Sequence, residues 1–513
     1  MAPNYQTPGV YIVEKNAFPG SAAAVETAIP VFIGYTEKSE RDGKSLLYKP
    51  TRVTSYADFL ECFGKGFPSQ FTIEPSSIAG EGSIMINGKA MVVRIRDNNT
   101  AVLYNAIRLF YSNGGSVCYV LSVKTYGRST LPQAIEVQSA DSVKQVVSLI
   151  IDIDDFIGAD NNVFSILETE SEPTLVVLPD VVADPVIAYQ LYPLVLQHCA
   201  KMQNRFAIFD VIHKPGATIG EECSYFKEHI GVQYLDYGAA YYPFLKTSIV
   251  QQDEIGYNNL DASVNLRDLL REDNVSEILS DFEALQDDEL NELARVNLDH
   301  SLKAASPVFN SIVQLIRSKL NLLPPSPAIA GVYTLVDTSR RVWTAPANIS
   351  LSMVTGPAVD ISHEVQQNLN VDVISGKSIN VIRSFPNLGT LVWGARTLDG
   401  NSSEWKYVNV RRTMIMIEQS LKYAVQAYVF EANNANTWVT VSSMLNNFLY
   451  NLWTQGALAG STPDQAFHVR IGLGTTMTPH DVLDGIMRIS VMVAILRPAE
   501  FTIITFQQQM QQS

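Results

Sequence analysis

The chain has 513 residues, of which 46% are hydrophobic and 17% are charged, and its formal net charge is −15. This composition excludes disordered, collagenous and disulfide-scaffold proteins, and the acidic charge argues against a nucleic acid partner bound through its phosphates. The four cysteines form no Cys-x-x-Cys pair, the N-terminus lacks a signal-peptide pattern, and no stretch is apolar enough for a membrane helix. We therefore expect a multidomain chain that folds in the cytoplasm and does not insert stably into membranes.

The first predicted element is a strand close to the N-terminus, formed by Val10, Tyr11, Ile12 and Val13. A second strand over 30–35 and a short helix over 55–64 come next, in a segment rich in Gly, Pro and Ser. A helical pattern over 101–112 then leads into a nearly continuous apolar strand over 117–123.

The middle of the chain repeats this alternation of apolar strand and helix. Apolar strands are predicted over 175–180, 205–210 and 238–243, and helical stretches near 185–202 and 220–230 separate them. Short, fully apolar strands that alternate with helices are typical of a parallel or mixed sheet covered on both faces. We therefore predict an α/β fold with mixed α+β character.

The segment Leu323-Pro-Pro-Ser-Pro marks the clearest domain boundary. Before it lie an acidic helical region and a helix that starts at Ser306-Pro307. After it, helices are predicted over about 411–430 and 440–456, followed by an alternating strand over 489–496. The last strand comprises Phe501, Thr502, Ile503, Ile504, Thr505 and Phe506.

The motifs of common enzyme and metal sites are incomplete. Two Gly-Lys-Ser triplets lack the upstream glycine of a phosphate-binding loop, and the acidic stretch that begins at Asp152 lacks the ligands and glycine of a calcium loop. The seven histidines show no metal-ligand spacing. We therefore expect no cofactor and no metal.

One enzyme hypothesis is kept as the alternative. Asp180 and Asp210 lie at the carboxyl ends of predicted strands, where open α/β sheets bind ligands, and His213 is only three residues beyond Asp210, so a hydrolase could use these three residues. Aspartate at such positions also commonly caps the next loop or helix. We favour the capping role.

An ordered set of short motifs covers both ends of the chain. The motifs are Thr7-Pro-Gly-Val-Tyr-Ile-Val-Glu, Asn113-Gly-Gly-Ser-Val-Cys-Tyr-Val, Ala330-Gly-Val-Tyr-Thr-Leu-Val-Asp, Val342-Trp-Thr-Ala-Pro-Ala-Asn, Ile379-Asn-Val-Ile-Arg-Ser-Phe-Pro, Val392-Trp-Gly-Ala-Arg-Thr-Leu, Arg411-Arg-Thr, Ile417-Glu-Gln-Ser-Leu, Phe430-Glu-Ala-Asn and Arg497-Pro-Ala-Glu-Phe. Taken together, they resemble the tail sheath proteins of contractile phage tails and phage-tail-like injection systems. No single motif is diagnostic, but the ordered set is specific.

This resemblance implies a domain organisation. Residues 1–29 would join 329–513 in an inner, tube-facing domain, and 30–328 would form an outer α/β region with subdomains over 30–100 and 101–328. The two terminal strands would act as arms that add to sheets of neighbouring subunits. The helix over 411–430 would face the tube, with Arg412, Glu418, Lys422 and Gln426 as polar candidates.

The resemblance also implies a function without catalysis. Such a subunit polymerises as a helical contractile sheath around an inner tube and, on triggering, contracts to drive the tube through a target envelope. Its partners would be further copies of the chain, the inner tube protein, and baseplate and terminal cap proteins. Assembly would occur in the bacterial cytoplasm, before the subunit becomes part of a phage tail or a released particle.

The origin of the particle is a separate question. A single chain that carries both terminal regions differs from type VI secretion sheaths, which divide the sheath between two polypeptides. The modest outer region favours a phage-tail-like injection particle over a phage tail.

Overall fold

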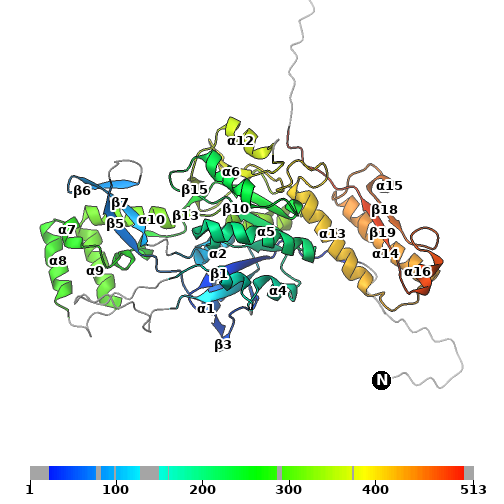
Figure 1. Cartoon of the computed structure of the whole chain (residues 1–513), viewed down its shortest axis with the longest axis horizontal. Helices are drawn as coiled ribbons and strands as arrows, with labels where there is room; N and C mark the ends of the chain where they lie inside the picture. Colours follow the sequence, from blue (N-terminus) through cyan, green and yellow to red (C-terminus); the bar gives the residue numbers. More distant parts are fainter. Residues whose placement is uncertain are drawn as a thin grey trace, which may run out of the picture. The chain divides into compact units, whose positions relative to one another are not determined.

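The computed structural model describes residues 22–76, 82–96, 100–127, 149–159, 161–285, 292–372 and 375–501 (Figure 1). The predicted N-terminal strand Val10–Val13 lies outside these residues, and so does the last strand except for Phe501. The chain divides into two compact units. One comprises Met1–Val25 with Thr413–Leu496, and the other comprises Glu26–Arg412 with Arg497–Ser513.

The larger unit is built on a mixed sheet, in which nine strands pair among the residues described. Their order is β14 (Ile349–Ser350), β17 (Gly389–Val392), β16 (Asn380–Phe385), β11 (Gly238–Tyr242), β10 (Phe206–Asp210), β9 (Leu175–Val177), β1 (Pro30–Thr36), β8 (Cys118–Thr125) and β4 (Thr51–Val53). Strands β16 to β8 run parallel, and the strands at both edges run antiparallel. This arrangement confirms the predicted α/β fold.

Helices cover both faces of this sheet, as the apolar strands predicted. On one face, Phe206 and Ile208 of β10 share a core with α2 (Leu103–Ser112) and α11 (Ser326–Arg340). On the other face, the Phe209 ring lies 4.7 Å from that of Tyr192 on α5 (Pro185–Met202). Helix α6 (Ile219–His229) packs beside α5. Alternate residues of one strand therefore serve opposite cores.

A second core lies within the same unit. It combines the antiparallel strands β5 (Phe71–Pro75), β7 (Lys89–Ile95) and β6 (Ser83–Ile86) with helices α8 (Asp273–Glu283), α9 (Glu292–Ala305) and α10 (Pro307–Leu320). Segments from both predicted outer subdomains, 30–100 and 101–328, contribute to this core.

Shorter elements complete the larger unit. They are β2 (Glu40–Arg41), β3 (Lys44–Ser45), α1 (Tyr56–Phe63), α3 (Asp154–Ile157), α4 (Val163–Glu168), β12 (Leu245–Thr247), α7 (Leu266–Leu269), β13 (Leu322–Leu323), β15 (Val354–Pro357) and α12 (His363–Asn370). Helix α1 ends at Gly64, which has a positive φ, as its sequence predicts.

The smaller unit is mainly helical. It contains most of α13 (Val408–Gln426), then α14 (Ala435–Thr454), α15 (Pro463–Ala466) and α16 (Pro479–Leu483). Strands β18 (Phe467–Arg470) and β19 (Ser490–Val493) form an antiparallel pair. Val441, Met444 and Leu445 of α14 form its core, against apolar residues of α13 and of the segments around the strand pair.

The boundary between the units falls at 412/413, whereas the sequence placed a domain boundary at 328/329. Helix α11 directly follows the Pro-Pro segment, and it packs into the main core with Ala328, Ile329 and Tyr333 fully buried. Strands β14, β16 and β17 then complete the large sheet. Prolines at 324 and 325 therefore mark the start of a core helix rather than the edge of a compact unit.

Candidate functional site

Asp180 holds a strand and a helix together. Its carboxylate is fully buried and accepts hydrogen bonds from the backbone N–H of Tyr35 at 2.7 Å, of Val102 at 2.6 Å and of Leu103 at 2.8 Å. Tyr35 belongs to β1, and the other two N–H groups lie at the start of α2. Burial raises the pKa of Asp180 to about 6, although the three N–H donors oppose that rise. The carboxylate satisfies helix N–H groups that would otherwise lack a partner.

Asp210 fastens a second helix in a similar way. It ends β10, is buried, and accepts hydrogen bonds from the N–H of Ser326 at 2.7 Å and from its Oγ at 2.6 Å. Ser326 begins α11. Burial raises the pKa of Asp210 to about 7, and the bonds to Ser326 oppose that rise. Both aspartates thus bond groups at helix N-termini, but the predicted role of capping the next loop or helix is not what the structure shows, because α2 and α11 lie 78 and 116 residues away in the chain.

His213 bonds to neither aspartate in this arrangement. Its Nδ1 lies 3.0 Å from Oε1 of Glu222, which also accepts the N–H of Lys214 at 2.7 Å, while Oε2 of Glu222 accepts the Tyr242 hydroxyl at 2.7 Å. The hydrolase alternative with Asp180, Asp210 and His213 is therefore wrong, because the two aspartates are buried against helix N-termini and the histidine bonds to a different carboxylate.

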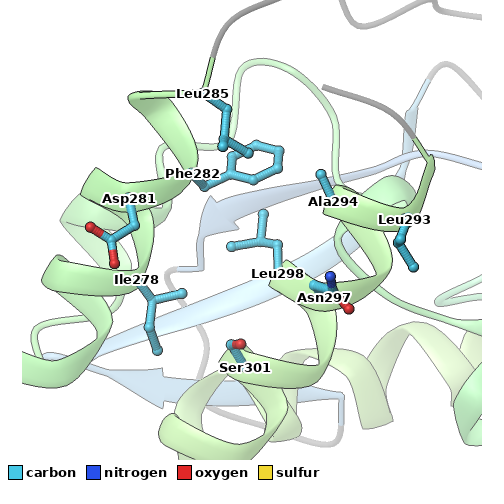
Figure 2. A pocket seen from close by; sticks show the side chains of 9 residues that line it. All are labelled: Ile278, Asp281, Phe282, Leu285, Leu293, Ala294, Asn297, Leu298 and Ser301. Carbon is cyan, nitrogen blue, oxygen red and sulfur yellow. The ribbon is translucent and has the colours of Figure 1, made fainter. Parts of the chain in front are cut away.

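A pocket of about 440 Å³ lies between α8 and α9, and none of Asp180, Asp210 and His213 lines it. Figure 2 shows Phe282 and Leu298 between the two helices, and the polar lining residues are Asp281, Asn297 and Ser301. Among the described residues, no group of three or more His, Cys, Asp or Glu side chains is placed to hold a metal ion. Among the described residues that line the pocket, apolar side chains alternate with single polar groups, and there is no combination of acid, base and nucleophile.

Helix α13 carries the four predicted tube-facing residues. Lys422 and Gln426 are exposed and Glu418 is half-buried. Arg412 is only 3% exposed, and it forms an ion pair of 2.5 Å with Asp337 on α11. Arg412 is therefore not available as a surface contact. Asp337 ends the motif Ala330-Gly-Val-Tyr-Thr-Leu-Val-Asp, but its pairing with Arg412 could not be predicted because the two residues are 75 positions apart in the chain.

The strand pair β18–β19 offers open backbone edges. Within the part of the chain that the structure describes, these two strands pair only with each other. A two-stranded sheet is marginally stable alone, and its outer edges present N–H and C=O groups to any further strand. At the start of the predicted C-terminal arm, Phe501 is 72% exposed.

Exposed apolar side chains are frequent on the smaller unit. Phe430 is fully exposed and has a positive φ of 71°, which is unusual for a bulky residue. The other large apolar side chains exposed there are Tyr423, Val429, Val439, Tyr450, Leu473, Leu483, Ile486, Met492 and Leu496. Open strand edges together with exposed apolar side chains are typical of a subunit of a protein assembly.

Comparison with known proteins agrees with this class. The family model for the phage tail sheath C-terminal domain matches residues 401–509. The sheath of an extracellular contractile injection system, PVC, in its contracted state is 27% identical, with a TM-score of 0.60 and 99% coverage of both chains. The contracted helical sheath of the anti-feeding prophage is 25% identical, with a TM-score of 0.60, over 98% of this chain and 100% of that chain.

Two curated tail sheath proteins match over shorter stretches. The protein of Vibrio phage KVP40 is 23% identical over 165 residues, which are 32% of this chain and 23% of the relative. That of Burkholderia phage BcepMu is 29% identical over 147 residues, which are 27% of this chain and 30% of the relative. The matched stretches thus span less than a third of each curated relative. The chain is similar to contractile tail sheath proteins, and the resemblance recognised in its motifs is confirmed.

In the described residues, no helix combines the length and the apolar character needed to cross a membrane.

Proposed function

We propose that this chain is the structural subunit of a contractile sheath, which polymerises as a helix of subunits around an inner tube. The observation that carries this proposal is the similarity to contracted sheath subunits over nearly the whole chain. A head-to-tail contact that does not close on itself generates a helical filament from one kind of subunit. The partners would be further copies of the chain, the inner tube, a baseplate and a terminal cap protein.

The terminal arms would connect the subunits by strand addition. The β18–β19 pair has edges that a strand from a neighbouring subunit can extend, and the strand-forming segments Val10–Val13 and Phe501–Phe506 provide such strands. Added strands bond through the backbone, so the connection requires few specific side chains. The segments 1–29 and 329–513, which the sequence predicts to form one domain, would form the tube-facing region together. Lys422 and Gln426 are the exposed polar candidates for the contact with the tube.

Contraction would draw its energy from burial of subunit surface. In this mechanism, assembly on the tube holds the subunits in an extended lattice, and release at the baseplate lets them rotate as nearly rigid bodies into a denser one. Each additional few hundred Å² of apolar contact would provide several kcal/mol per subunit at ~25 cal/mol per Å², before entropic costs. The exposed apolar residues of the smaller unit, Phe430 among them, are suited to such contacts.

The proposal is tested by purifying the whole chain without a tube protein and imaging it by negative-stain electron microscopy. We expect tubules that resemble a contracted sheath. Deletion of residues 1–14 or of 499–513 should leave a folded subunit that forms no tubules. A full-length chain that stays a folded monomer at high concentration would contradict the sheath function, and tubules formed by either deletion variant would contradict strand addition.

The tube contact needs the tube protein as a reagent. Lys422→Glu should weaken co-sedimentation with tubes of the cognate tube protein and leave tubule formation by the sheath chain unchanged. Lys214→Glu, a charge reversal on the larger unit, is the matched control. Equal co-sedimentation of the two variants would remove Lys422 from the tube contact.

A further inference from the structure

The chain passes between its two compact units three times, at 25/26, 412/413 and 496/497. At each passage, the segment that enters or leaves the larger unit is bound there by an arginine–carboxylate pair. Two such pairs serve the three passages. Both pairs lie within the larger unit.

The first pair binds two of the three segments. Arg412 donates to both carboxylate oxygens of Asp337, at 3.0 and 2.5 Å, and to the backbone carbonyl of Thr27 at 2.8 Å. The Thr27 hydroxyl donates to the same carboxylate at 2.5 Å. The guanidinium also lies 4.6 Å from the centre of the Tyr333 ring, a cation–π distance. The incoming segment and the outgoing helix are thus tied to α11 together.

The second pair binds the third segment. Glu500 accepts two hydrogen bonds from Arg396, from Nε at 2.8 Å and from Nη2 at 2.7 Å. It also accepts the Asn370 amide at 2.8 Å and the Tyr407 hydroxyl at 3.0 Å. Each carboxylate oxygen therefore accepts two hydrogen bonds, and the arginine contact is bidentate, the strongest common geometry for this pair.

The guanidinium of Arg396 is held in place by further contacts within the larger unit. Nη1 of Arg396 donates to the backbone carbonyls of Asn370 at 3.3 Å and Gly400 at 3.1 Å, and the Arg396 side chain is only 6% exposed. Burial alone would raise the pKa of Glu500, but the bonds from Arg396 and Asn370 and the arginine charge hold it below its usual value. Without the carboxylate, two donor nitrogens of a buried guanidinium would lose their partner, which is a costly state.

We propose that Arg396, Asn370 and Tyr407 form a carboxylate-binding site that takes Glu500 as its ligand and fixes the root of the C-terminal arm on the larger unit. This inference rests on the proposed function, since the arm acts on a neighbouring subunit only in a polymer. Glu500 lies directly before the strand-forming segment 501–506. A pull on the arm by a neighbouring subunit is therefore transmitted to the α/β unit through this ion pair, and it bypasses the smaller unit that precedes the arm in the chain.

The experiment measures how firmly the root of the arm is held. All four native cysteines are buried, so Phe501→Cys in the full chain provides a selective site for a nitroxide spin label. Glu500→Gln keeps the shape of the side chain and removes its charge. Glu404→Gln, at an exposed position, is the matched control for the charge change. We expect Glu500→Gln to shorten the rotational correlation time of the label several-fold, Glu404→Gln to leave it unchanged, and Tyr407→Phe to give an intermediate value.

Tubule formation by the unlabelled variants provides the second measurement. Glu500→Gln should lower the fraction of chain in tubules relative to Glu404→Gln. Equal label mobility in these two variants would overturn the binding site itself. A mobile label with unchanged tubules would overturn its role in transmitting force. If the wild-type chain formed no tubules, the proposed function would fail, whereas the label mobility would still decide whether the root of the arm is bound.

Discussion

The two buried aspartates should respond very differently to replacement by asparagine. Asp180 accepts three backbone N–H groups, with donors on both of its oxygens. An asparagine has one acceptor oxygen, so its NH₂ group would face at least one backbone N–H. Asp210 instead bonds one N–H and one hydroxyl of the same serine. An asparagine there can accept the N–H and donate to the hydroxyl oxygen, so both bonds survive.

These geometries set the expected magnitudes. Asp180→Asn leaves up to two buried donors without partners, at about 1–3 kcal/mol each, and we expect a loss of about 4 kcal/mol. Asp210→Asn keeps both bonds and removes a buried charge, so it should not lower the stability at pH 8. For a unit of about 400 residues, the unfolding entropy is about 0.8 kcal/mol per degree, so the melting temperature should fall by about 5 °C for Asp180→Asn and should not fall for Asp210→Asn.

The assay is thermal unfolding of the full chain at pH 8, where both aspartates of the wild type are ionised. Scanning calorimetry can separate transitions of the two units, which a single spectroscopic melting curve would merge. A smaller effect of Asp180→Asn than of Asp210→Asn would refute the reasoning that the number of donors around each carboxylate decides the cost.

Three further predictions concern the stability of variants at single residues. Burial raises the pKa of Asp210 to about 7, so the contribution of this residue to stability is fully present below its unfolded pKa near 4 and is lost as the pH rises through 7. The wild type should therefore lose stability relative to Asp210→Asn between pH 5 and pH 8, which is measured as the shift of the denaturant midpoint. Asp337→Asn should lower the melting temperature by about 4 °C through loss of a buried ion-pair partner worth about 3 kcal/mol, whereas the exposed control Asp360→Asn should leave it unchanged. A Cβ at Gly331 would lie 2.6 Å from a backbone oxygen of α2, so Gly331→Ala should lower the free energy of unfolding, measured by chemical denaturation, by about 1–3 kcal/mol. The control Gly220→Ala, at a helical position with open space around the added Cβ, should raise it by about 0.5–1 kcal/mol.

Local patterns predicted the elements of the larger unit well. The stretch 185–202 is helical as expected, and the apolar strands after 117, 205 and 238 are β8, β10 and β11. These elements have strong periodicity or uninterrupted apolar runs, which depend little on the rest of the fold. A capping role for Asp180 and Asp210 could be anticipated from their positions at strand ends, but the helices that they cap could not, because α2 and α11 lie 78 and 116 residues away in the chain.

The division into units could not be read from the sequence. A Pro-Pro segment indicates a break in local structure, but whether the next helix joins the preceding core depends on contacts far apart in the chain, such as those of Tyr333 with the sheet. The roles of Arg412 and Glu500 were missed for the same reason. Each has a partner far away in the sequence, at Asp337 and Arg396, and no spacing rule connects them.

The order of strands in the large sheet has a consequence for synthesis. From β1, the neighbours on one side are β9, β10, β11 and β16, and their order in the sheet is also their order along the chain. A nascent chain can therefore extend the sheet outward strand by strand as it leaves the ribosome, and all nine strands precede residue 393. Residues 413–496, which make up most of the smaller unit, and the C-terminal arm emerge only afterwards. Translation thus delays one of the two segments that would connect subunits until the α/β body can already be folded.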